Sequence, residues 1–249
     1  MMTHTQSAPH AFTALTFNIK VGVDSHPQAL ARDLLALERS LGRLNLLSLQ
    51  EVGRCWQMGV PVHQAAYLAA CLQHRAVQFA PALTDSLGGQ FGVALTADSS
   101  LTARHQLLLP RELDEQRTLL STRYTPAGWS RSITVLCTHL SIKEAERVAQ
   151  AALIATVVRE TSGPIILLGD LNDHPDSETL SHLKQAGLKD HWRERHGEAL
   201  GYSFSVKSPN RRIDYLLTRG LRCVELELLT WVHSSDHLPL WGRFELEEP

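Results

Sequence analysis

The chain is poor in cysteine and lacks both long apolar runs and a large excess of either charge. Its four cysteines among 249 residues are widely separated and form no Cys-x-x-Cys pair, which excludes a zinc ribbon and a disulfide framework and favours a reducing compartment. No apolar run approaches the length of a membrane-spanning helix, and residues 1–10 lack the cationic start and apolar stretch of a signal peptide. We therefore expect a cytoplasmic protein without membrane insertion.

The charge balance gives no global attraction to long nucleic acids. The formal net charge is −2 and the sequence pI is about 6.7, whereas proteins that bind long nucleic acids tightly usually carry a basic field. Locally, the stretch from His191 to Arg212 holds Arg193, Arg195, His196, Lys207, Arg211 and Arg212 against only two acids, Glu194 and Glu198. This stretch forms either a positive rim just before Asp214 or a solvated loop of mixed charge.

Hydrophobic residues make up 43% of the chain and charged residues 20%, which is the composition of an ordinary globular protein with a sizeable core. No linker, internal repeat or low-complexity segment divides it. We expect a flexible N-terminus over residues 1–10 and a single domain over residues 11–249.

The apolar pattern alternates between short strands and a few amphipathic helices. Helices are predicted from His26 to Arg43, with Pro27 as the first helical residue, from Pro61 to about Leu72, and from Lys143 to Thr161. In the last of these we expect an inward face of Ala145, Val148, Ala152, Ala155 and Val158. Strands are predicted at 14–19, 44–49, 76–79, 91–96, 104–109, 118–124, 132–138, 165–168, 212–218, 224–229 and 238–246. Many short strands with few helices indicate two sheets packed face to face with helices outside.

Polar residues follow several of these strands where each strand ends. They are Asn18, Gln50-Glu51, Thr138-His139, Asp170 with Asn172, and Asp214 together with Asp236-His237. Loops held by rigid strands commonly carry chemistry, so these side chains are candidates for one site. The competing interpretation of Gly169-Asp170-Leu171-Asn172 is an ordinary turn, because Asp and Asn bond their own backbone in turns.

Six short motifs in order resemble those of the endonuclease/exonuclease/phosphatase superfamily, the deoxyribonuclease I-like fold. They are Phe17-Asn18-Ile19, Leu49-Gln50-Glu51-Val52, Thr138-His139-Leu140, Gly169-Asp170-Leu171-Asn172, Arg212-Ile213-Asp214-Tyr215 and Ser235-Asp236-His237-Leu238-Pro239. Each is weak alone, but the series spans nearly the whole chain. The resemblance implies a four-layer α/β-sandwich with two mixed β-sheets packed face to face, helices on the outer faces and the site at one end of the strands.

The resemblance also implies roles for the site residues. Asn18, Glu51 and Asp236 would hold Mg²⁺ or Mn²⁺, since hard cations prefer oxygen ligands. Asp170 would orient and deprotonate the attacking water, with Asn172 bonding that water or a phosphate oxygen. His237, oriented by Asp214, would contact a phosphate oxygen as imidazolium, and His139 would be a second histidine against the phosphate. At the position of His139, the abasic-site nuclease branch of the family tends to have a tyrosine.

Residues that contact the rest of the substrate are harder to identify. Arg54 and Trp56 follow Glu51 directly and offer a cation and a stacking plane, although Trp56 equally suits the role of capping a small hydrophobic cluster. Arg117 precedes a strand where family members carry an acid and an arginine near the site, and Arg212 belongs to the basic stretch. These four are the expected substrate-binding residues.

The expected function is divalent-metal-dependent hydrolysis of a phosphodiester bond by in-line attack of water, on nucleic acid or a nucleotide-like diester. A phosphomonoesterase acting on a small phosphorylated metabolite is the alternative within the same chemistry, because one fold serves many substrates. A catalytically silent binding scaffold is the alternative outside it. The sequence leaves the oligomeric state and the choice between the two metals open.

Overall fold

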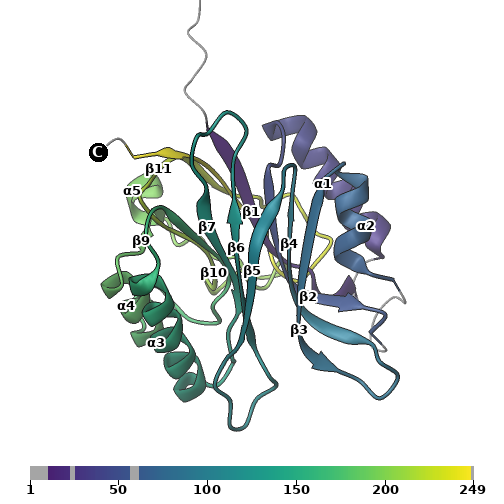
Figure 1. The fold of residues 1–249 in the computed structure, drawn as a ribbon, viewed down its shortest axis with the longest axis horizontal. Coiled ribbons are helices and arrows are strands. Elements are labelled where there is room, and N and C mark those ends of the chain that lie inside the picture. Colours follow the sequence, from purple (N-terminus) through teal and green to yellow (C-terminus); the bar gives the residue numbers. More distant parts are fainter. Residues whose placement is uncertain (1–10, 23–25, 57–61, 248–249) are drawn as a thin grey trace, which may run out of the picture.

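The computed structural model describes residues 11–22, 26–56 and 62–247. The predicted flexible segment 1–10 and the predicted helix start at Pro61 lie outside these ranges. Within them, twelve strands form two six-stranded sheets (Figure 1). The first sheet has the order β11 (Leu221–Leu228), β12 (Leu240–Leu246), β1 (Phe12–Asn18), β2 (Leu46–Arg54), β4 (Gln90–Ala97) and β3 (Ala76–Thr84). The second has the order β5 (Leu101–Leu108), β6 (Thr118–Tyr124), β7 (Ile133–His139), β8 (Ile165–Asp170), β10 (Asp214–Arg219) and β9 (Lys189–Asp190).

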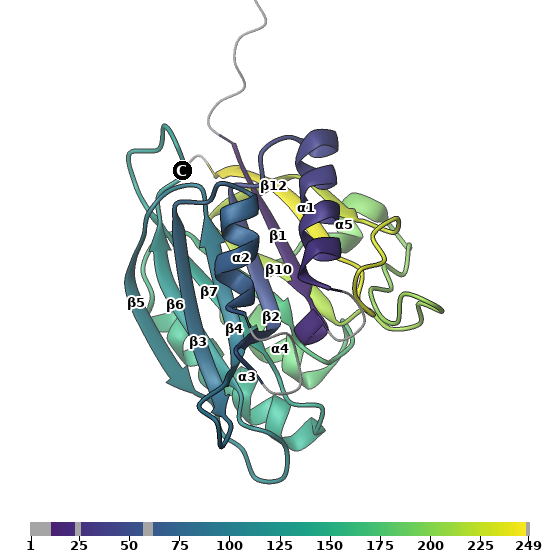
Figure 2. The ribbon, with the colours of Figure 1, turned by 90° about the vertical axis from the view of Figure 1, so that its right-hand side faces the viewer.

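Helices cover both outer faces of the paired sheets. Helices α1 (Pro27–Leu41) and α2 (Gln64–Cys71) lie on the first sheet, as Figure 2 shows, and α3 (Glu144–Glu160) and α4 (Glu178–Gln185) lie on the second. The short helix α5 (Trp192–His196) contacts β11. The layer order helix, sheet, sheet, helix confirms the predicted four-layer α/β-sandwich.

Each sheet is built around one parallel strand pair, β1 with β2 and β7 with β8, whereas its other pairings are antiparallel. A parallel pair needs a crossover connection, which α1 supplies in the first sheet and α3 in the second. Consequently the carboxyl ends of β1, β7 and β8 and the neighbouring part of β2 carry polar residues that the sequence places after its strands.

Three apolar clusters fill the spaces between the layers. The cluster between the sheets includes Leu95, Val135 and Leu168, and the outer two join α1 and α2 to the first sheet and α3 and α4 to the second. Helix α1 buries Leu30, Leu34 and Leu37, each worth about 1.5–3 kcal/mol when removed from water. Its N-terminal Pro27 is where the sequence predicts it.

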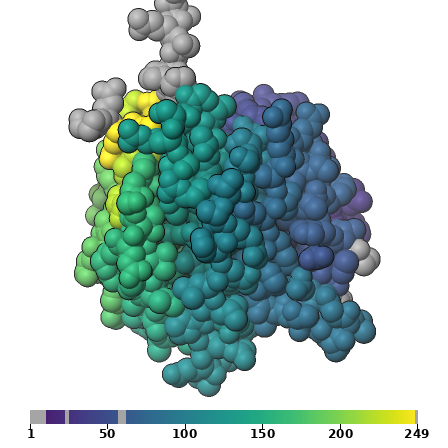
Figure 3. All heavy atoms as spheres, in the orientation of Figure 1, coloured from purple at the N-terminus to yellow at the C-terminus, as the bar shows by residue number. Residues whose placement is uncertain are grey.

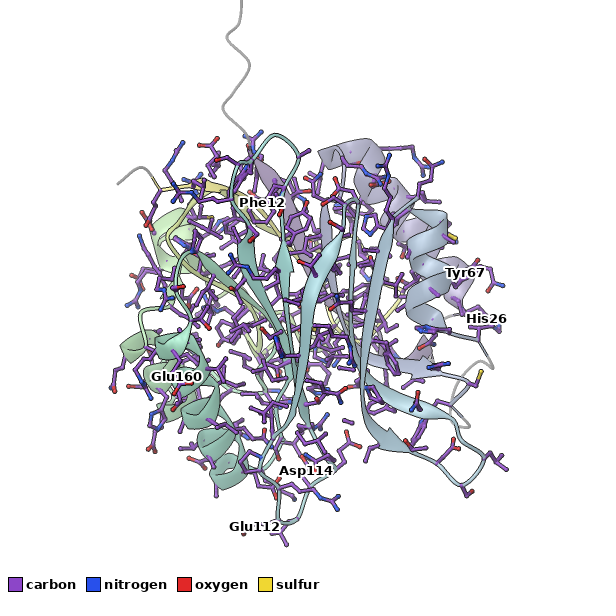
Figure 4. All side chains as sticks on the ribbon, viewed as in Figure 1. Phe12, His26, Tyr67, Glu112, Asp114 and Glu160 are labelled. Atoms are coloured by element: carbon purple, nitrogen blue, oxygen red, sulfur yellow. The ribbon has the colours of Figure 1, made fainter. Side chains whose placement is uncertain are left out.

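The edge strands β3 and β5 close the sandwich along one side. Three side chains bridge them: Gln78 donates to the Leu101 carbonyl, Arg104 to the Phe79 carbonyl and Gln106 to the Pro81 carbonyl. In Figure 3 the blue atoms of β3 and the teal atoms of β5 meet without a visible gap. At the upper end, Phe12 packs against Tyr124, Trp129 and Phe244 (labelled Phe12 in Figure 4).

The expected inward face of α3 is partly wrong. Ala145 is exposed, while two polar side chains of the helix, Glu146 and Gln150, are buried beside the apolar residues Ala151, Ile154, Ala155 and Val158. Both polar groups bind backbone amides outside the helix, Gln150 at Ser141 and Glu146 at residues 112–114. Their burial is therefore satisfied by hydrogen bonds, which an apolar pattern does not register.

Candidate active site

The strand ends of both sheets meet at one end of the sandwich. Asn18 at the end of β1 donates through Nδ2 to Asp170 Oδ2 at the end of β8, across the two sheets, at 3.1 Å. The same amide donates to Glu51 Oε1 at 2.9 Å. Asp214, the first residue of β10, is paired in register with Asp170. The structure therefore brings together residues from four separate strands, as the sequence predicts.

Glu51 reaches this place through a β-bulge. The register of β2 against β4 shifts between Leu49 and Val52, and Glu51 has a φ of 53°. A bulge re-aims side chains that a regular strand would alternate. Gln50 points into the core, where it donates to Ser48 Oγ at 2.9 Å, while the Glu51 carboxylate contacts Asn18. The strand runs on to Arg54 and does not end at Leu49.

Asp170 is almost completely buried among polar groups. Its Oδ1 accepts from the Asn172 backbone amide at 2.9 Å, and its Oδ2 lies 3.5 Å from His139 Nε2 and 3.6 Å from His237 Nε2. Burial, together with the nearby charge of Asp214, raises the pKa of Asp170 to about 7. A carboxylate with a pKa near neutrality is a competent general base at physiological pH.

His237 is held between two carboxylates. Its Nδ1 lies 2.9 Å from Asp214 Oδ2, which also accepts a hydrogen bond from Ser203 Oγ at 2.6 Å, and its Nε2 faces Asp170. Burial alone lowers the pKa of His237, but Asp214 and Asp170 overcome this and raise it to about 10. His237 is therefore an imidazolium at neutral pH, and Phe204 packs against its ring at 4.8 Å.

His139 has the opposite protonation state. Arg117 Nη1 lies 2.8 Å from His139 Nδ1, and because a guanidinium can only donate, this nitrogen accepts. Burial, followed by the positive charges of Arg117 and His237, holds the pKa of His139 well below its usual value. Asn172 Nδ2 lies 3.0 Å from His139 Nε2 and donates to the Leu140 carbonyl at 2.9 Å. The two histidines thus place one neutral and one charged imidazole beside Asp170.

The loop that carries Arg117 is tied to the start of α3. Glu146 accepts from the backbone amides of Glu112, Leu113 and Asp114, and these bonds, the one from Leu113 first, lower the pKa of Glu146 to about 2. Asp114 in turn accepts from Ser141 Oγ at 2.7 Å. Figure 4 labels Asp114 and Glu112 in this loop at the lower end of the sandwich. The loop fixes the position of Arg117 and, through it, of His139.

The four expected substrate-binding residues have different surroundings. Arg54 is exposed and its Nη1 lies 3.5 Å from Gln90 Oε1, while Trp56 packs on Phe91 with ring centroids 5.6 Å apart. Arg117 is 5% exposed and bonds His139. Arg212 is 7% exposed, and its guanidinium pairs with Asp190 and lies over the rings of Trp192 and Tyr215. The contacts of the two buried arginines are thus to protein groups that shape the site.

The oxygen set around Glu51 fits a hard divalent cation. Among the described residues no Lys or Arg pairs with Glu51, whose carboxylate is half-buried beside Asn18. Asp236 forms an ion pair with Lys20 at 2.9 Å, which a cation at this place would have to replace. Asp170, Asp214 and His237 also lie within 4.8 Å of one another. Either group of side chains could hold a cation, the oxygen ligands around Glu51 or the cluster of Asp170, Asp214 and His237.

Several residues of the site carry no signal in the sequence. Ser203 and Phe204 orient Asp214 and His237, although they stand in a loop without any motif. Glu115 Oε1 lies 2.9 Å from Arg117 Nη1. Burial raises the pKa of Glu115, and the negative charges of Asp114 and Glu51 raise it further, whereas the charge of Arg117 lowers it. Glu115 stands two positions before Arg117, which the sequence assigns to the substrate, whereas the contacts of Ser203 and Phe204 appear only in the tertiary structure.

The chain is similar to known proteins in both sequence and structure. The sequence profile of the endonuclease/exonuclease/phosphatase family matches residues 15–237. The uncharacterized protein YbhP of Escherichia coli strain K12 is 34% identical over 137 residues, which cover 53% of this chain and 54% of YbhP. The matched part thus spans about half the length of this relative.

Solved structures share the fold at low sequence identity. Mannosyl-6-phosphatase Bt3783 of Bacteroides thetaiotaomicron has a TM-score of 0.75 and 16% identity, covering 95% of this chain and 100% of that one. TDP2 of D. rerio, complexed with a single-strand DNA product, has a TM-score of 0.70 and 19% identity, covering 94% of this chain and 99% of that one. At these identities the likeness shows the fold alone.

Proposed function

Because the chain belongs to the endonuclease/exonuclease/phosphatase family, whose members hydrolyse phosphoester bonds, we propose that it is a phosphodiesterase that uses water as the nucleophile. The observation that carries the proposal is the position of Asp170, a buried carboxylate with a pKa of about 7 between a neutral and a charged imidazole. Such a group accepts the proton of an attacking water near neutral pH.

The remaining residues stabilise and orient the reacting groups. The imidazolium of His237 directs an N–H toward the place of Asp170 and would donate to a non-bridging phosphate oxygen as negative charge develops there. Asp214 keeps that imidazolium charged and aligned. Asn172, fixed by its bond to the Leu140 carbonyl, adds an amide beside His139. All of these donors are held in place before the substrate binds.

Mg²⁺ or Mn²⁺ is the proposed cofactor, held by Glu51 with Asn18 and Asp236. When bound, the cation would neutralise charge on the phosphoryl oxygens and assist departure of the leaving oxygen. Glu51 supplies the carboxylate without a cationic partner among the described residues, and Asp236 would exchange Lys20 for the metal. Oxygen ligands of this kind suit both cations.

A nucleic acid or nucleotide-like diester is the proposed substrate class, with a monoester of a small metabolite as the competitor. Relatives of this fold bear names of both kinds, a mannosyl-6-phosphatase and a protein bound to a single-strand DNA product. The intact set of convergent acids, amides and histidines argues against a silent scaffold, which has no physical need for them. No helix in the described ranges is both long and apolar enough to cross a membrane.

The test compares bis-p-nitrophenyl phosphate with p-nitrophenyl phosphate in Mg²⁺, Mn²⁺ or chelator, using wild type, Asp170→Asn and the matched control Asp33→Asn. Asp33 lies on α1 and pairs with Arg32 at the surface. We expect metal-dependent diester hydrolysis that falls about 10²–10⁴-fold in Asp170→Asn and stays in the control. Near wild-type activity of Asp170→Asn would refute the proposed base, and hydrolysis of the monoester alone would refute the diesterase.

A further inference from the structure

A wide groove opens beside the active site. It has a volume of about 920 Å³ and is lined by residues 172–176 and 187–190, by parts of α3, α4 and α5, and by residues 197–200, 202 and 210–213; we call it the α5 groove. Asn172 lines the groove and also contacts His139, so the groove and the active site share a wall. Pockets of roughly 300–1,000 Å³ hold ligands of drug size, which are larger than a single phosphate group.

The groove wall is cationic. Six Arg or Lys residues line it against four Asp or Glu residues. Four of the six are paired with carboxylates: Arg147 with Asp173, Arg212 with Asp190, Lys189 with Glu194 and Arg193 with Glu198. Arg211 is different, because it is exposed and no carboxylate pairs with it in the described parts of the chain. Its guanidinium is therefore available to an anion from outside.

Arg211 is linked to the catalytic histidine through one aromatic ring. Its guanidinium lies 4.5 Å from the centroid of the Phe204 ring, and Phe204 packs against His237 at 4.8 Å. The guanidinium is thus held over a ring that itself packs on His237, one aromatic side chain away from the catalytic imidazole. Arg is also the residue best suited to grip a phosphate, because its donors form a rigid fork.

The uncharged residues that line the α5 groove offer contacts for an organic group. Tyr202 is half-buried and Leu200 is 63% exposed, and both line the groove in the segment that leads to Arg211. Single-stranded nucleic acids are bound by the combination found here, a cationic groove with an aromatic surface against which a base stacks. An uncharged ligand would leave Arg211 without a partner.

We propose that the α5 groove binds the nucleoside next to the scissile bond and that Arg211 binds a second phosphate group on it. This inference rests on the proposed function and narrows it, since the preferred substrate is then an oligonucleotide-like diester with more than one phosphate. Tyr202 contacts the base or sugar between the two phosphates. A bis-phosphorylated sugar shares the anionic chemistry but lacks the base.

The test uses two chromogenic diesters that differ only in the second phosphate: p-nitrophenyl thymidine 5′-phosphate with and without a 3′-phosphate. We expect the 3′-phosphate to raise kcat/KM about 10-fold or more in the wild type, the range of a charged hydrogen bond. Arg211→Met keeps a side-chain stem over Phe204 and should remove this advantage, whereas Arg211→Lys should keep part of it. Arg39→Ala, an exposed position on α1, is the matched control and should keep all of it.

Two kinetic results would overturn the inference. One is a wild type that does not distinguish the two diesters, and the other is an Arg211→Met variant that keeps the 3′-phosphate advantage. Binding of thymidine 3′,5′-bisphosphate, thymidine 5′-phosphate and fructose 1,6-bisphosphate by calorimetry gives a readout that is independent of turnover. If neither diester is hydrolysed, the proposed function fails, and the groove is judged on this binding alone. Tighter binding of the nucleoside bisphosphate that Arg211→Met abolishes supports the groove, while equal binding of all three ligands refutes it.

Discussion

Asp214→Asn should lower the pKa of His237 while leaving its imidazole in the same position. In the wild type, Ser203 Oγ and His237 Nδ1 lie 2.6 and 2.9 Å from Asp214 Oδ2. The asparagine keeps an oxygen that accepts from both groups but removes the negative charge. The charges of Asp170 and Asp236 then remain to offset the cost of burying the charge of His237. The pKa of His237 should therefore fall, and its imidazolium should be lost at a lower pH.

The size of the fall follows from the geometry. The rise in the pKa of His237 from 6.5 to about 10 corresponds to ~5 kcal/mol in favour of the imidazolium. Two opposite charges 4 Å apart attract by about 4 kcal/mol at an effective dielectric constant of 20, and a carboxylate in contact raises a pKa by about 1–3 pH units. We expect the pKa of His237 to drop by about 1–3 pH units in Asp214→Asn.

The raised pKa of His237 also makes the stability of the fold depend on pH. Because the folded pKa is raised, the imidazolium stabilises the fold fully below pH 6.5, and this contribution is lost as the pH rises through about 10. In Asp214→Asn, whose His237 has a lower pKa, this contribution to stability should be lost at a lower pH. Its kcat should fall about 10²–10⁴-fold, the usual contribution of a proton-transfer group or of its orientation.

The assay is imidazole NMR titration of the chelator-treated protein, followed by the pH profile of kcat/KM. Ser203→Ala is the matched control, because it removes a donor to Asp214 Oδ2 and leaves the carboxylate charge. The pKa of His237 should not fall in this variant, because the Asp214 carboxylate keeps its negative charge and loses only the hydrogen bond from Ser203. An unchanged pKa of His237 in Asp214→Asn, or an equal fall in Ser203→Ala, would refute the reasoning.

Three further changes test other parts of the site. Asp170→Asn should not lower the Tm at pH 8, because it removes a carboxylate whose pKa burial and Asp214 raise to about 7; a lower Tm by calorimetry would contradict this. Glu146→Gln should lower the Tm at neutral pH, and the difference from wild type should narrow below pH 4.5, since the low pKa of Glu146 means that its contribution is lost as the pH falls toward about 2. Equal melting at pH 7 would show that the bonds to the loop amides contribute nothing. Arg117→Met should raise the pKa of His139 in the same NMR titration by removing a neighbouring positive charge, although burial still lowers it; no change would mean that Arg117 does not control this imidazole.

The fold was predictable where apolar periodicity determines structure. The strand at Thr118–Tyr124 is correct to the residue, and the other predicted strands differ from the structure mainly at their ends. Helices α4 and α5 are not among the predicted helices, although Ser177 caps α4 by accepting from the Leu180 amide, a signal that the sequence does contain. With eight and five residues, these helices are too short for a clear periodic pattern.

The site was predictable as a set of residues but not as a set of contacts. Asn18, His139 and Asp170 end their strands, and the parallel pair in each sheet carries these strand ends to one place. The partner of each member comes from a distant segment: Arg117 is 22 positions from His139, and Ser203 is 11 from Asp214. No local rule joins such residues. Arg117 is expected at the substrate from its place in the sequence, whereas the structure gives it a contact with a histidine.

The backbone around the site shows why a regular sandwich alone could not form it. Seven non-glycine residues in the described ranges have a positive φ, and four of them, Lys20, Val21, Glu51 and Asn172, are site residues or follow Asn18 closely. Such conformations cost on the order of 1–3 kcal/mol each and persist only when the surroundings hold them. Here they turn the Glu51 carboxylate out of the alternation of β2 and bring the Asn172 amide back to Leu140 and His139. Burial of the three apolar clusters offsets this cost, so the stability of the sandwich permits a strained and densely charged site at its end.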